Sequence, residues 1–564
     1  MPGNLMRKTL LFLIVCWLIF LSLGFAQPVQ ISNDHRLSNP QPLRADIEVN
    51  QVLSVGSNSI KIAFDPVSGY LYYLKVNGQV FQVDLSGPTR TLAYTAQNHG
   101  ISSTAGFTIV SDGAFFLVGN ISQNGNNVGI IKKGELVGGS RTWSTVAQTV
   151  PYPLNGHFDH SFNAIAIDPN EEFLYVNSGA RTDHGEAQHD SGPLAGLREF
   201  PITSILLRIP INAQDLLLEN DEIFLRDNGF WFAKGLRNTF DLAFNGHGDL
   251  IGPENSGDRD DPEEINWIRE VHHYGFPWRA GTNDTPQQFA GYDPDNDPLV
   301  SSSSYAYGLG FFHDDPNYPP PPAGVSFTDP IPGIGPDVDH YRDPDDSLGT
   351  LRDASDLGVT IGTLTAHSSP LGIVFDKDSV LNGEFAGDGF MLNFSGSSSV
   401  LGDPGEDLVH LKFTKTNDEY QVQITRLVEG FDGPVDAVMI DNKIYVIENP
   451  SGGSLWEVVL PAKPTAIEIS DDPAQSQKFA LRQNYPNPFN PATRIEYALD
   501  KPGFVSLKIY NMAGQIVKTV IDHVRKSPGR HIIEVDMSQF ASGIFLYELS
   551  MANKKLTRKM VLLK

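Results

Sequence analysis

One pattern recurs six times between residues 60 and 460: an apolar strand, a polar turn, and a second strand rich in Leu, Tyr, Phe and Val. The six copies occupy residues 60–85, 104–134, 162–211, 239–268, 370–413 and 434–460. Each copy predicts one small antiparallel sheet, and such a sheet cannot bury both of its faces alone. The repeat therefore constrains the fold more strongly than any other feature of the chain.

Radially arranged sheets bury one another and leave only short, protected edges. We therefore expect an all-β fold, a six-bladed β-propeller over residues 40–460. The periodicity typical of helices is scarce in this region. A β-sandwich or two smaller β domains remain the alternatives. A propeller places loops from every blade around one central mouth, where several blades can reach a ligand together.

The first 26 residues have the pattern of a secretory signal peptide. Arg7 and Lys8 precede an apolar run, and Ala26 ends a segment of small residues at the expected cleavage point. An N-terminal membrane anchor is the alternative. The single cysteine, Cys16, lies inside this segment, so the mature chain can form no disulfide and no cysteine metal site. No later stretch is apolar for long enough to span a bilayer, which predicts an exported, water-soluble protein without a transmembrane anchor.

Charge divides the remaining chain into two parts. The whole chain has a net charge of −26, which argues against binding to nucleic acid, because phosphate backbones require clustered cations. Residues 478–564 hold 14 Lys and Arg against 6 Asp and Glu, so the strong acidity belongs to the residues before them. A reversal of sign at one point suggests two domains. The polar residues 461–477 show no apolar period and are expected to link them.

Three loops carry groups that could perform chemistry. Asp159 and His160 precede the third copy, and an imidazole beside a carboxylate can take up a proton near neutral pH. Arg237 and Asn238 precede the fourth copy. Residues 254–266 hold many carboxylates and turn carbonyls, as Ca²⁺ prefers. The alternatives are a structural histidine, a surface arginine and a solvated acidic turn.

Together these loops resemble the soluble pyrroloquinoline quinone (PQQ) dependent glucose/sorbosone dehydrogenase family, whose fold is a six-bladed propeller. The resemblance covers roughly residues 60–460. It is carried by the runs at 159–161, 235–238, 263–266, 274–278 and 367–372.

The resemblance implies a secreted quinoprotein-like oxidoreductase that transfers a hydride from a sugar or other alcohol to PQQ. It implies that His160 is the general base, that Asp159 lies next to it at the cofactor, and that Arg237 steadies charge on the quinone. Asn238 and His367 are implied to bind PQQ together with Arg237. Backbone carbonyls of Gly257 and Asp258 are implied to hold Ca²⁺.

The chain departs from the family pattern where cations are usual. Asn393 follows the strand that often precedes a Lys or an Asn-Arg pair, and Pro434 and Asp436 occupy positions near which the glucose branch has two Arg residues. PQQ has three carboxylates, so the loss of cations weakens its binding. A non-catalytic propeller that binds glycans or proteins at the cell surface is therefore the alternative function.

Residues 282–366 form an insertion rich in Asp, Pro, Gly and Ser. Asp293, Asp295 and Asp297 alternate as in calcium loops, which suggests a second Ca²⁺ site. The run lacks the later Gly and Glu of a complete helix–loop–helix site.

The last part of the chain, residues 478–564, shows short alternating strands broken by Gly, Asn and Pro, which predicts a small β-sandwich. The run from Asn484 to Phe489 and the strands after it closely resemble the C-terminal sorting domain of type IX secretion cargo. That resemblance implies export by the Sec signal, then passage through the outer membrane by the type IX machinery. The expected location is extracellular or on the outer-membrane surface. A carbohydrate-binding or structural β module is the alternative.

Overall fold

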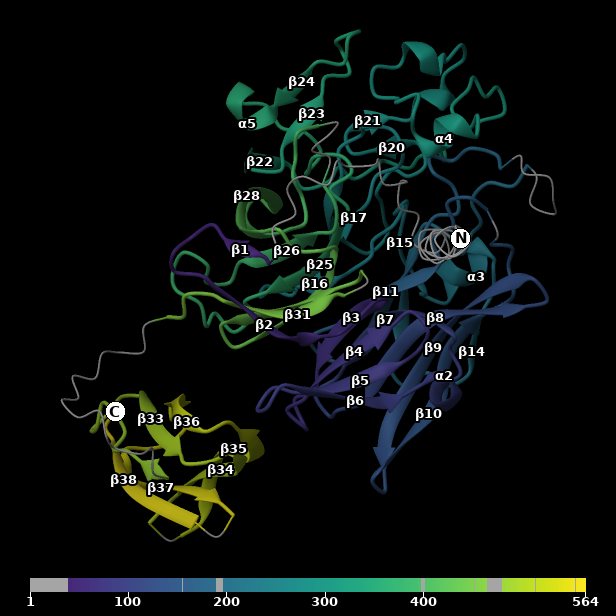
Figure 1. Cartoon of the computed structure of the whole chain (residues 1–564). Helices are drawn as coiled ribbons and strands as arrows, with labels where there is room; N and C mark the ends of the chain where they lie inside the picture. The colour runs from purple at the N-terminus through teal and green to yellow at the C-terminus, as the bar shows by residue number, and fades with distance from the viewer. Residues whose placement is uncertain are drawn as a thin grey trace, which may run out of the picture. The chain divides into compact units, whose positions relative to one another are not determined.

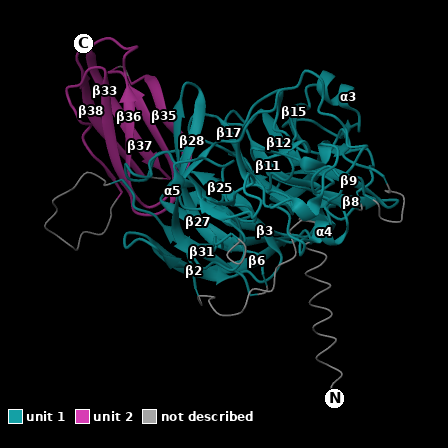
Figure 2. Cartoon of the chain, turned by 90° about the horizontal axis from the view of Figure 1, so that it is seen from above, with its two compact units in different colours: residues 1–464 teal, residues 465–564 magenta. Residues whose placement is uncertain are grey.

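The computed structural model describes residues 39–154, 156–188, 196–396, 401–450, 452–463, 479–512, 514–552 and 554–564. The chain divides into two compact units, residues 1–464 and 465–564 (Figure 2). Both are built mainly of β-strands (Figure 1). The predicted signal peptide and most of the predicted linker lie outside the described residues.

In the described part of unit 1, the strands form six sheets of three or more strands, and each repeat copy lies in a different one. Sheet 1 contains β3 (Ser59–Phe64), β4 (Leu71–Lys75), β5 (Val80–Asp84) and β6 (Thr89–Tyr94). Sheet 2 contains β7 (Ser103–Ile109), β8 (Phe115–Gln123), β9 (Asn126–Val137), β10 (Ser140–Thr149) and β14 (Leu216–Leu218). Sheet 3 contains β11 (Phe162–Ile167), β12 (Phe173–Ser178), β13 (Ile205–Pro210), β15 (Trp231–Lys234) and β19 (His272–His273).

The other three sheets are, like the first three, mainly antiparallel. Sheet 4 contains β16 (Ala243–Phe244), β17 (Leu250–Glu254) and β18 (Glu264–Ile268). Sheet 5 contains β25 (Pro370–Phe375), β26 (Gly389–Asn393), β27 (Asp407–Thr416), β28 (Glu419–Glu429), β1 (Gln41–Pro42) and β22 (Gly333–Pro336). Sheet 6 contains β29 (Pro434–Ile440), β30 (Lys443–Glu448), β31 (Ser454–Val459) and β2 (Glu48–Ser54).

Successive residues of a strand point to opposite faces of its sheet, and here both faces are buried. In β8, Phe115 and Leu117 belong to the apolar core shared with sheets 1 and 6, whereas Phe116 and Val118 belong to the core shared with sheet 3. Further apolar cores lie between sheets 3 and 4, 4 and 5, and 5 and 6. Neighbouring sheets therefore supply the burial that one sheet cannot supply alone.

Each repeat copy begins with one strand, and these six first strands follow one another in a closed order. Strand β3 neighbours β7, which neighbours β11, and the order continues through β16, β25 and β29 back to β3. The sixth sheet is completed by the N-terminal strand β2, which pairs antiparallel with β31. Loops that precede these first strands consequently come close to one another.

Short elements make up most of the remaining described structure of unit 1. These are β20 (Arg279–Ala280), β21 (Asn283–Asp284), β23 (His340–Arg342), β24 (Leu351–Asp353), α2 (Ala96–His99), α3 (Glu222–Asp227), α4 (Tyr305–Gly308), α5 (Ala354–Leu357), η1 (Pro286–Gln288) and η2 (Pro294–Asn296). Several of them, with β22, belong to the predicted insertion. Among the described residues, no helix has the length and apolar character needed to cross a bilayer.

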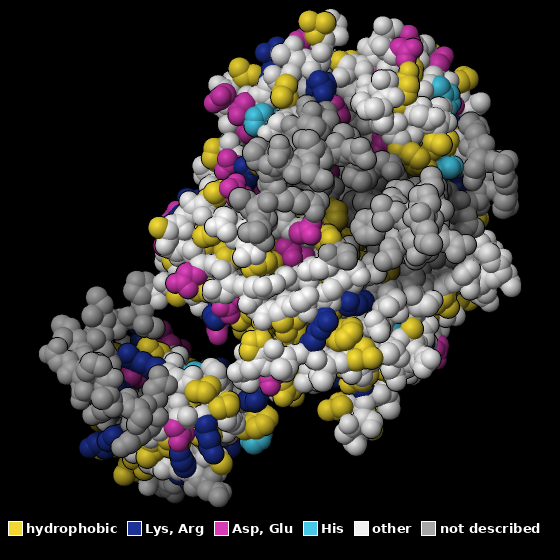
Figure 3. Space-filling view, in the orientation of Figure 1, with side chains coloured by type: hydrophobic (Ala, Val, Ile, Leu, Met, Phe, Trp, Pro, Cys, Tyr) yellow, Lys and Arg dark blue, Asp and Glu magenta, His cyan; other side chains and the backbone are white. Residues whose placement is uncertain are grey.

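Unit 2 has two antiparallel sheets. One contains β32 (Ala480–Leu481), β33 (Ala492–Leu499) and β36 (Gly529–Asp536), and the other contains β34 (Gly503–Tyr510), β35 (Ile516–Lys526), β37 (Gly543–Met551) and β38 (Lys554–Leu562). Both sheets contribute to one apolar core, with Ile495 from the first and Leu507 from the second. Lys and Arg side chains lie on its surface (Figure 3), including the exposed Arg494 and Lys555.

Candidate functional site

Loops of sheets 3 and 4 meet at Ala180, which follows β12. The backbone nitrogen of His160 donates to the carbonyl oxygen of Ala180 at 2.7 Å, and Nδ1 of the same histidine lies 3.3 Å from that oxygen. The nitrogen of Ala180 in turn donates to the carbonyl oxygen of Arg237 at 2.6 Å. The structure thus brings His160 and Arg237, which the sequence places in separate loops, to either side of one residue.

Arg237 fastens three parts of the chain together. Its Nη2 donates to Oδ1 of Asp183 at 3.0 Å, and its Nε donates to the Asp183 carbonyl at 2.9 Å. Its Nη1 donates to the carbonyl oxygens of Asn255 and Ser256 at 3.3 and 2.7 Å. The guanidinium therefore holds the loop that carries Gly257 and Asp258 against the loop after β12.

Asp183 is the centre of a buried polar cluster. Its carboxylate also accepts from the backbone nitrogen of Asp258 at 3.0 Å and lies 2.9 Å from Nδ1 of His184. Burial acts to raise the pKa of Asp183, but the hydrogen bond with His184 and the charge of Arg237 outweigh it and lower the pKa to about 2. Burial acts to lower the pKa of His184, but the charge of Glu186 and the hydrogen bond with Asp183 raise it.

Asn238 belongs to a chain of buried amides that crosses sheets 3, 4 and 5. Its Oδ1 accepts from Nδ2 of Asn163 at 2.8 Å, and its Nδ2 donates to Oδ1 of Asn255 at 2.8 Å. Asn177 donates to Asn163, and Asn255 donates to the carbonyl of Pro370. This chain of hydrogen bonds fixes the positions of the loops around His160 and Arg237.

The predicted cofactor ligand His367 contacts Asp260 in the acidic run, residues 254–266. Its Nε2 lies 2.8 Å from Oδ1 of Asp260, whose Oδ2 accepts from Arg342 of β23 at 2.9 Å. Burial acts to lower the pKa of His367, but Asp260 and further nearby carboxylates raise it to about 9. His367 is therefore a cation at neutral pH, balanced by Asp260.

The acidic run is buried, contrary to the alternative of a solvated turn. Glu254, Asp258, Glu263 and Glu264 are each at most 5% exposed. Burial, with repulsion between neighbouring carboxylates, raises the pKa of Asp258 to about 6, and burial raises the pKa of Glu263 to about 8. The cations nearby, His367 and Arg237, act to lower both pKa values but do not outweigh burial. A divalent cation would supply the positive charge that these carboxyl groups lack.

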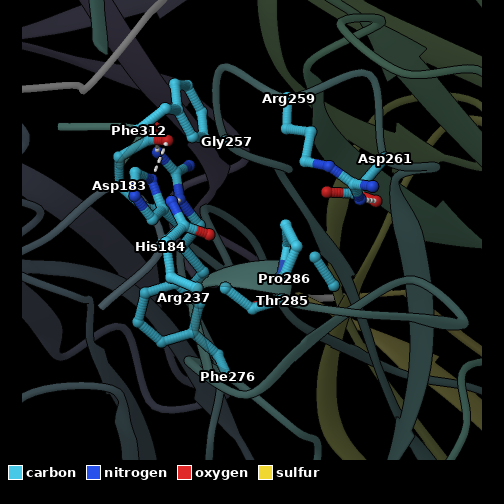
Figure 4. A pocket seen from close by; sticks show the side chains of 12 residues that line it. Asp183, His184, Arg237, Gly257, Arg259, Asp261, Phe276, Thr285, Pro286 and Phe312 are labelled. Atoms are coloured by element: carbon cyan, nitrogen blue, oxygen red, sulfur yellow. Dashed lines mark hydrogen bonds and ion pairs between the residues drawn. The ribbon is translucent and has the colours of Figure 1, made fainter. Parts of the chain in front are cut away.

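A small cavity lies beside this cluster (Figure 4). Figure 4 shows Asp183, His184 and Arg237 on one side of it and Arg259 and Asp261 on the other. Gly257 also lines the cavity, and a Cβ at that position would lie 2.8 Å from Oδ2 of Asp183, so a larger residue does not fit without a shift.

Asp159 lies close to a second buried arginine. Its Oδ2 accepts from the backbone nitrogen of Gly156, and its Oδ1 lies 4.0 Å from Nε of Arg181. Arg181 is fully buried, and among the described residues neither its Nε nor its Nη2 has a hydrogen-bond partner. Nη2, a buried cationic donor without an acceptor among the described residues, makes Arg181 a candidate anion-binding group.

The structure gives the three aspartates of the second predicted Ca²⁺ site separate partners. Asp293 accepts from the backbone nitrogen of Asp295, Asp295 accepts from the Tyr307 hydroxyl, and Asp297 pairs with Arg259 at 2.8 Å. That second Ca²⁺ site stays a prediction.

Sequence reasoning missed the loop after β12. Arg181, Asp183, His184 and Glu186 lie in this loop, and all are buried. A run of four charged or ionisable residues directly after an apolar strand was the available signal, since a strand end is where a sheet presents side chains to a shared mouth.

Several solved structures of sugar dehydrogenases are similar to the chain. A putative oxidoreductase (glucose dehydrogenase) from Thermus thermophilus shares 14% identity with a TM-score of 0.44, and covers 73% of this chain and 100% of its own. The soluble aldose sugar dehydrogenase from Escherichia coli, in its apo-form, shares 14% identity with a TM-score of 0.45, over 73% and 99% of the two chains. The PQQ-bound aldose sugar dehydrogenase from Streptomyces coelicolor shares 14% identity with a TM-score of 0.41, over 74% and 99%.

No curated protein matches the chain in sequence. A family model does match its end: residues 483–563 fit the secretion system C-terminal sorting domain. The matched residues are 81 of the 100 residues of unit 2. Unit 2 is thus a type IX C-terminal sorting domain, and it indicates that the protein is secreted to the cell surface or to the outside.

Proposed function

We propose that unit 1 is a six-bladed β-propeller that oxidises a hydroxyl group of a sugar or other alcohol, with PQQ as the hydride acceptor and Ca²⁺ as its partner ion. The observation that carries this proposal is the position of Ala180, which bonds His160 on one side and Arg237 on the other. Two of the loops that carry the family's motifs therefore lie next to each other, which supports the proposal. We propose that unit 2, as a β-sandwich, directs this enzyme out of the cell through the type IX machinery.

By charge, the described residues suit the calcium complex of PQQ better than PQQ alone. PQQ has three carboxylates, whereas Arg237 and His367 already pair with Asp183 and Asp260. Where the family has further cations, Asn393 donates to Asp407 and Asp436 pairs with Lys61. Ca²⁺ reduces the charge of the complex to −1.

Two groups of the site match this complex. A divalent cation would favour the ionised form of the carboxyls whose pKa burial raises, and the backbone carbonyls of Gly257 and Asp258 are the proposed ligands. Nη2 of Arg181, which has no hydrogen-bond partner among the described residues, can donate to the one remaining negative charge.

His160 is the proposed catalytic base. The Ala180 carbonyl, 3.3 Å from Nδ1, accepts a hydrogen bond from the N–H at that position, and in this tautomer Nε2 is the basic nitrogen. Nε2 takes the proton of the substrate hydroxyl. When bound, PQQ would accept the hydride from the carbon that carries this hydroxyl.

Arg237 acts in this proposal as a positioning residue, because its nitrogens already donate to Asp183, Asn255 and Ser256. It holds the Gly257 loop in place. Asn238 does the same through Asn163 and Asn255. The family resemblance assigned both residues direct contacts with the cofactor, and the hydrogen bonds favour the indirect role.

The test measures PQQ uptake by the purified secreted protein. Calorimetry records the uptake once in chelator and once with millimolar Ca²⁺. We expect binding only with Ca²⁺, and oxidation of a sugar panel by the loaded protein. Uptake that does not depend on Ca²⁺ would contradict the charge argument. No uptake under either condition would refute the PQQ enzyme and favour a propeller that only binds glycans or proteins, which the positions of Asn393 and Asp436 support.

A further inference from the structure

A second polar cluster lies in the insertion, on the two-stranded ladder of β23 and β24. His340 and Asp353 are register partners across this ladder, and Asp339 directly precedes β23. One ligand atom from each of the three side chains lies within 4.8 Å of the other two. Nε2 of His340 lies 3.9 Å from Oδ2 of Asp353. An imidazole and two carboxylates thus converge on one point.

Each carboxylate of this cluster uses one oxygen to hold the backbone. Oδ2 of Asp339 accepts from the nitrogen of Ser355 at 2.8 Å. Oδ1 of Asp353 accepts from the nitrogen of Asp356 at 3.0 Å and so caps α5. Both aspartates are therefore fixed in orientation by the start of α5 and do not depend on a ligand for their position.

Two other atoms of the cluster have no hydrogen-bond partner among the described residues. Asp339 is 1% exposed, yet its Oδ1 is buried without a hydrogen-bond partner in the described structure. Nδ1 of His340 is likewise buried and without a partner there. Burial raises the pKa of Asp339 even though Ser355 donates to it. Buried polar groups normally have partners, so these two atoms require an explanation.

We propose that Asp339, His340 and Asp353 bind a divalent transition-metal ion of the zinc class, with water as the remaining ligand. A nitrogen donor with two carboxylates suits Zn²⁺, whereas Ca²⁺ prefers six to eight oxygen ligands. The ion accepts the lone pairs that the protein leaves without partners. It joins the start of β23 to the end of β24, and the same β23 carries Arg342, which donates to Asp260 of the acidic run. The site does not share residues with the proposed PQQ site.

The experiment is calorimetric titration of ZnCl₂ into the secreted full-length protein after dialysis against chelator and then against metal-free buffer. We expect one site per chain that millimolar Ca²⁺ does not displace. Asp339→Asn and His340→Gln should each weaken binding at least tenfold. Asp356→Asn is the matched control, because its exposed carboxylate lies on the same turn outside the cluster, and it should bind as the parent does.

Circular dichroism shows whether each variant is folded. If Asp339→Asn does not fold, His340→Gln tests the proposal instead. The His340 side chain is 35% exposed, so its replacement leaves no cavity in a core and this variant should fold. The proposal is overturned if the parent protein binds no Zn²⁺, if His340→Gln binds as tightly as the parent, or if Ca²⁺ displaces the ion. None of these outcomes depends on PQQ or on oxidation of a sugar.

Discussion

Nη2 of Arg237 lies 3.0 Å from Oδ1 of Asp183, and both side chains are almost completely buried, at 4% and 1% exposed. The two residues are 54 positions apart, on loops of neighbouring sheets. This ion pair joins the loop that follows β12 to the loop that precedes β16.

Replacing Arg237 with Ala should destabilise unit 1. The change leaves the Asp183 carboxylate buried without its cation, and loss of one partner of a buried pair costs about 3–5 kcal/mol. Urea unfolding measures this loss. The exposed Arg226 of α3 is the control, and Arg226→Ala should leave the midpoint unchanged. An Arg237→Ala protein as stable as the parent would contradict the positioning role.

Replacing His160 with Ala should reduce turnover by about a hundredfold or more, the usual contribution of a general base. PQQ uptake should persist, because the base acts on the substrate hydroxyl. His157→Ala is the matched control, since His157 lies three residues away and contacts the hydroxyl of Tyr305 instead. Steady-state kinetics of both variants provide the measurement. Equal activity of His160→Ala and the parent would exclude His160 as the base.

The stability of the metal-free protein should fall as pH rises from about 5 to about 8. Glu263 has its pKa raised to about 8 by burial, so between its unfolded and folded pKa values the native state binds a proton that the unfolded state has lost. Stability then decreases with pH by up to about 1.4 kcal/mol per unit for this group. Glu263→Gln should make the decrease shallower by about that slope.

Urea unfolding in chelator at pH 5.5, 6.5 and 7.5 tests the effect of Glu263. The raised pKa of His367 acts in the same direction, because its stabilising charge is lost as pH rises through about 9. The decrease in Glu263→Gln therefore becomes shallower but does not vanish. A slope equal to that of the parent would show that Glu263 is ionised in the folded protein.

Calcium at millimolar concentration should raise the melting temperature, because an ion that binds only the folded state stabilises it by mass action. The effect should be smaller in Asp258→Asn, because this change keeps the backbone carbonyl ligand but removes a buried negative charge next to the ion. It should be unchanged in Asp339→Asn, whose site is proposed for a different ion. Differential scanning calorimetry with and without chelator decides this. Equal melting under both conditions would contradict a Ca²⁺ site in the acidic run.

Deleting residues 478–564 should leave unit 1 folded but retained in the periplasm. The apolar core of unit 2 contains only residues of unit 2, and the larger cores contain only residues of unit 1, so the melting of unit 1 should barely change. Immunoblots of periplasmic and extracellular fractions measure the location. Normal amounts of the truncated protein outside the cell would refute the sorting role.

The positions of the strands could be predicted from the sequence, because each repeat copy combines an apolar run with a turn. The closeness of His160 and Arg237 could be predicted from their places before the first strands of neighbouring sheets. The partners of Arg237 could not be predicted, because no pattern in the sequence links the loop that carries Asp183 to Arg237. The cluster of Asp339, His340 and Asp353 was missed because it depends on the pairing of β23 with β24 inside an irregular insertion.

Strand β2 lies at the start of unit 1, and its Gln51 donates to Ser454, 403 positions further along the chain. A chain that emerges from a translocation channel with its N-terminus first cannot make this pairing until nearly all of unit 1 has followed. The order in which the chain emerges therefore delays the pairing of β2 with β31 until shortly before the sorting domain leaves the channel. Unit 1 therefore reaches its final form only when residues from both of its ends are available for pairing.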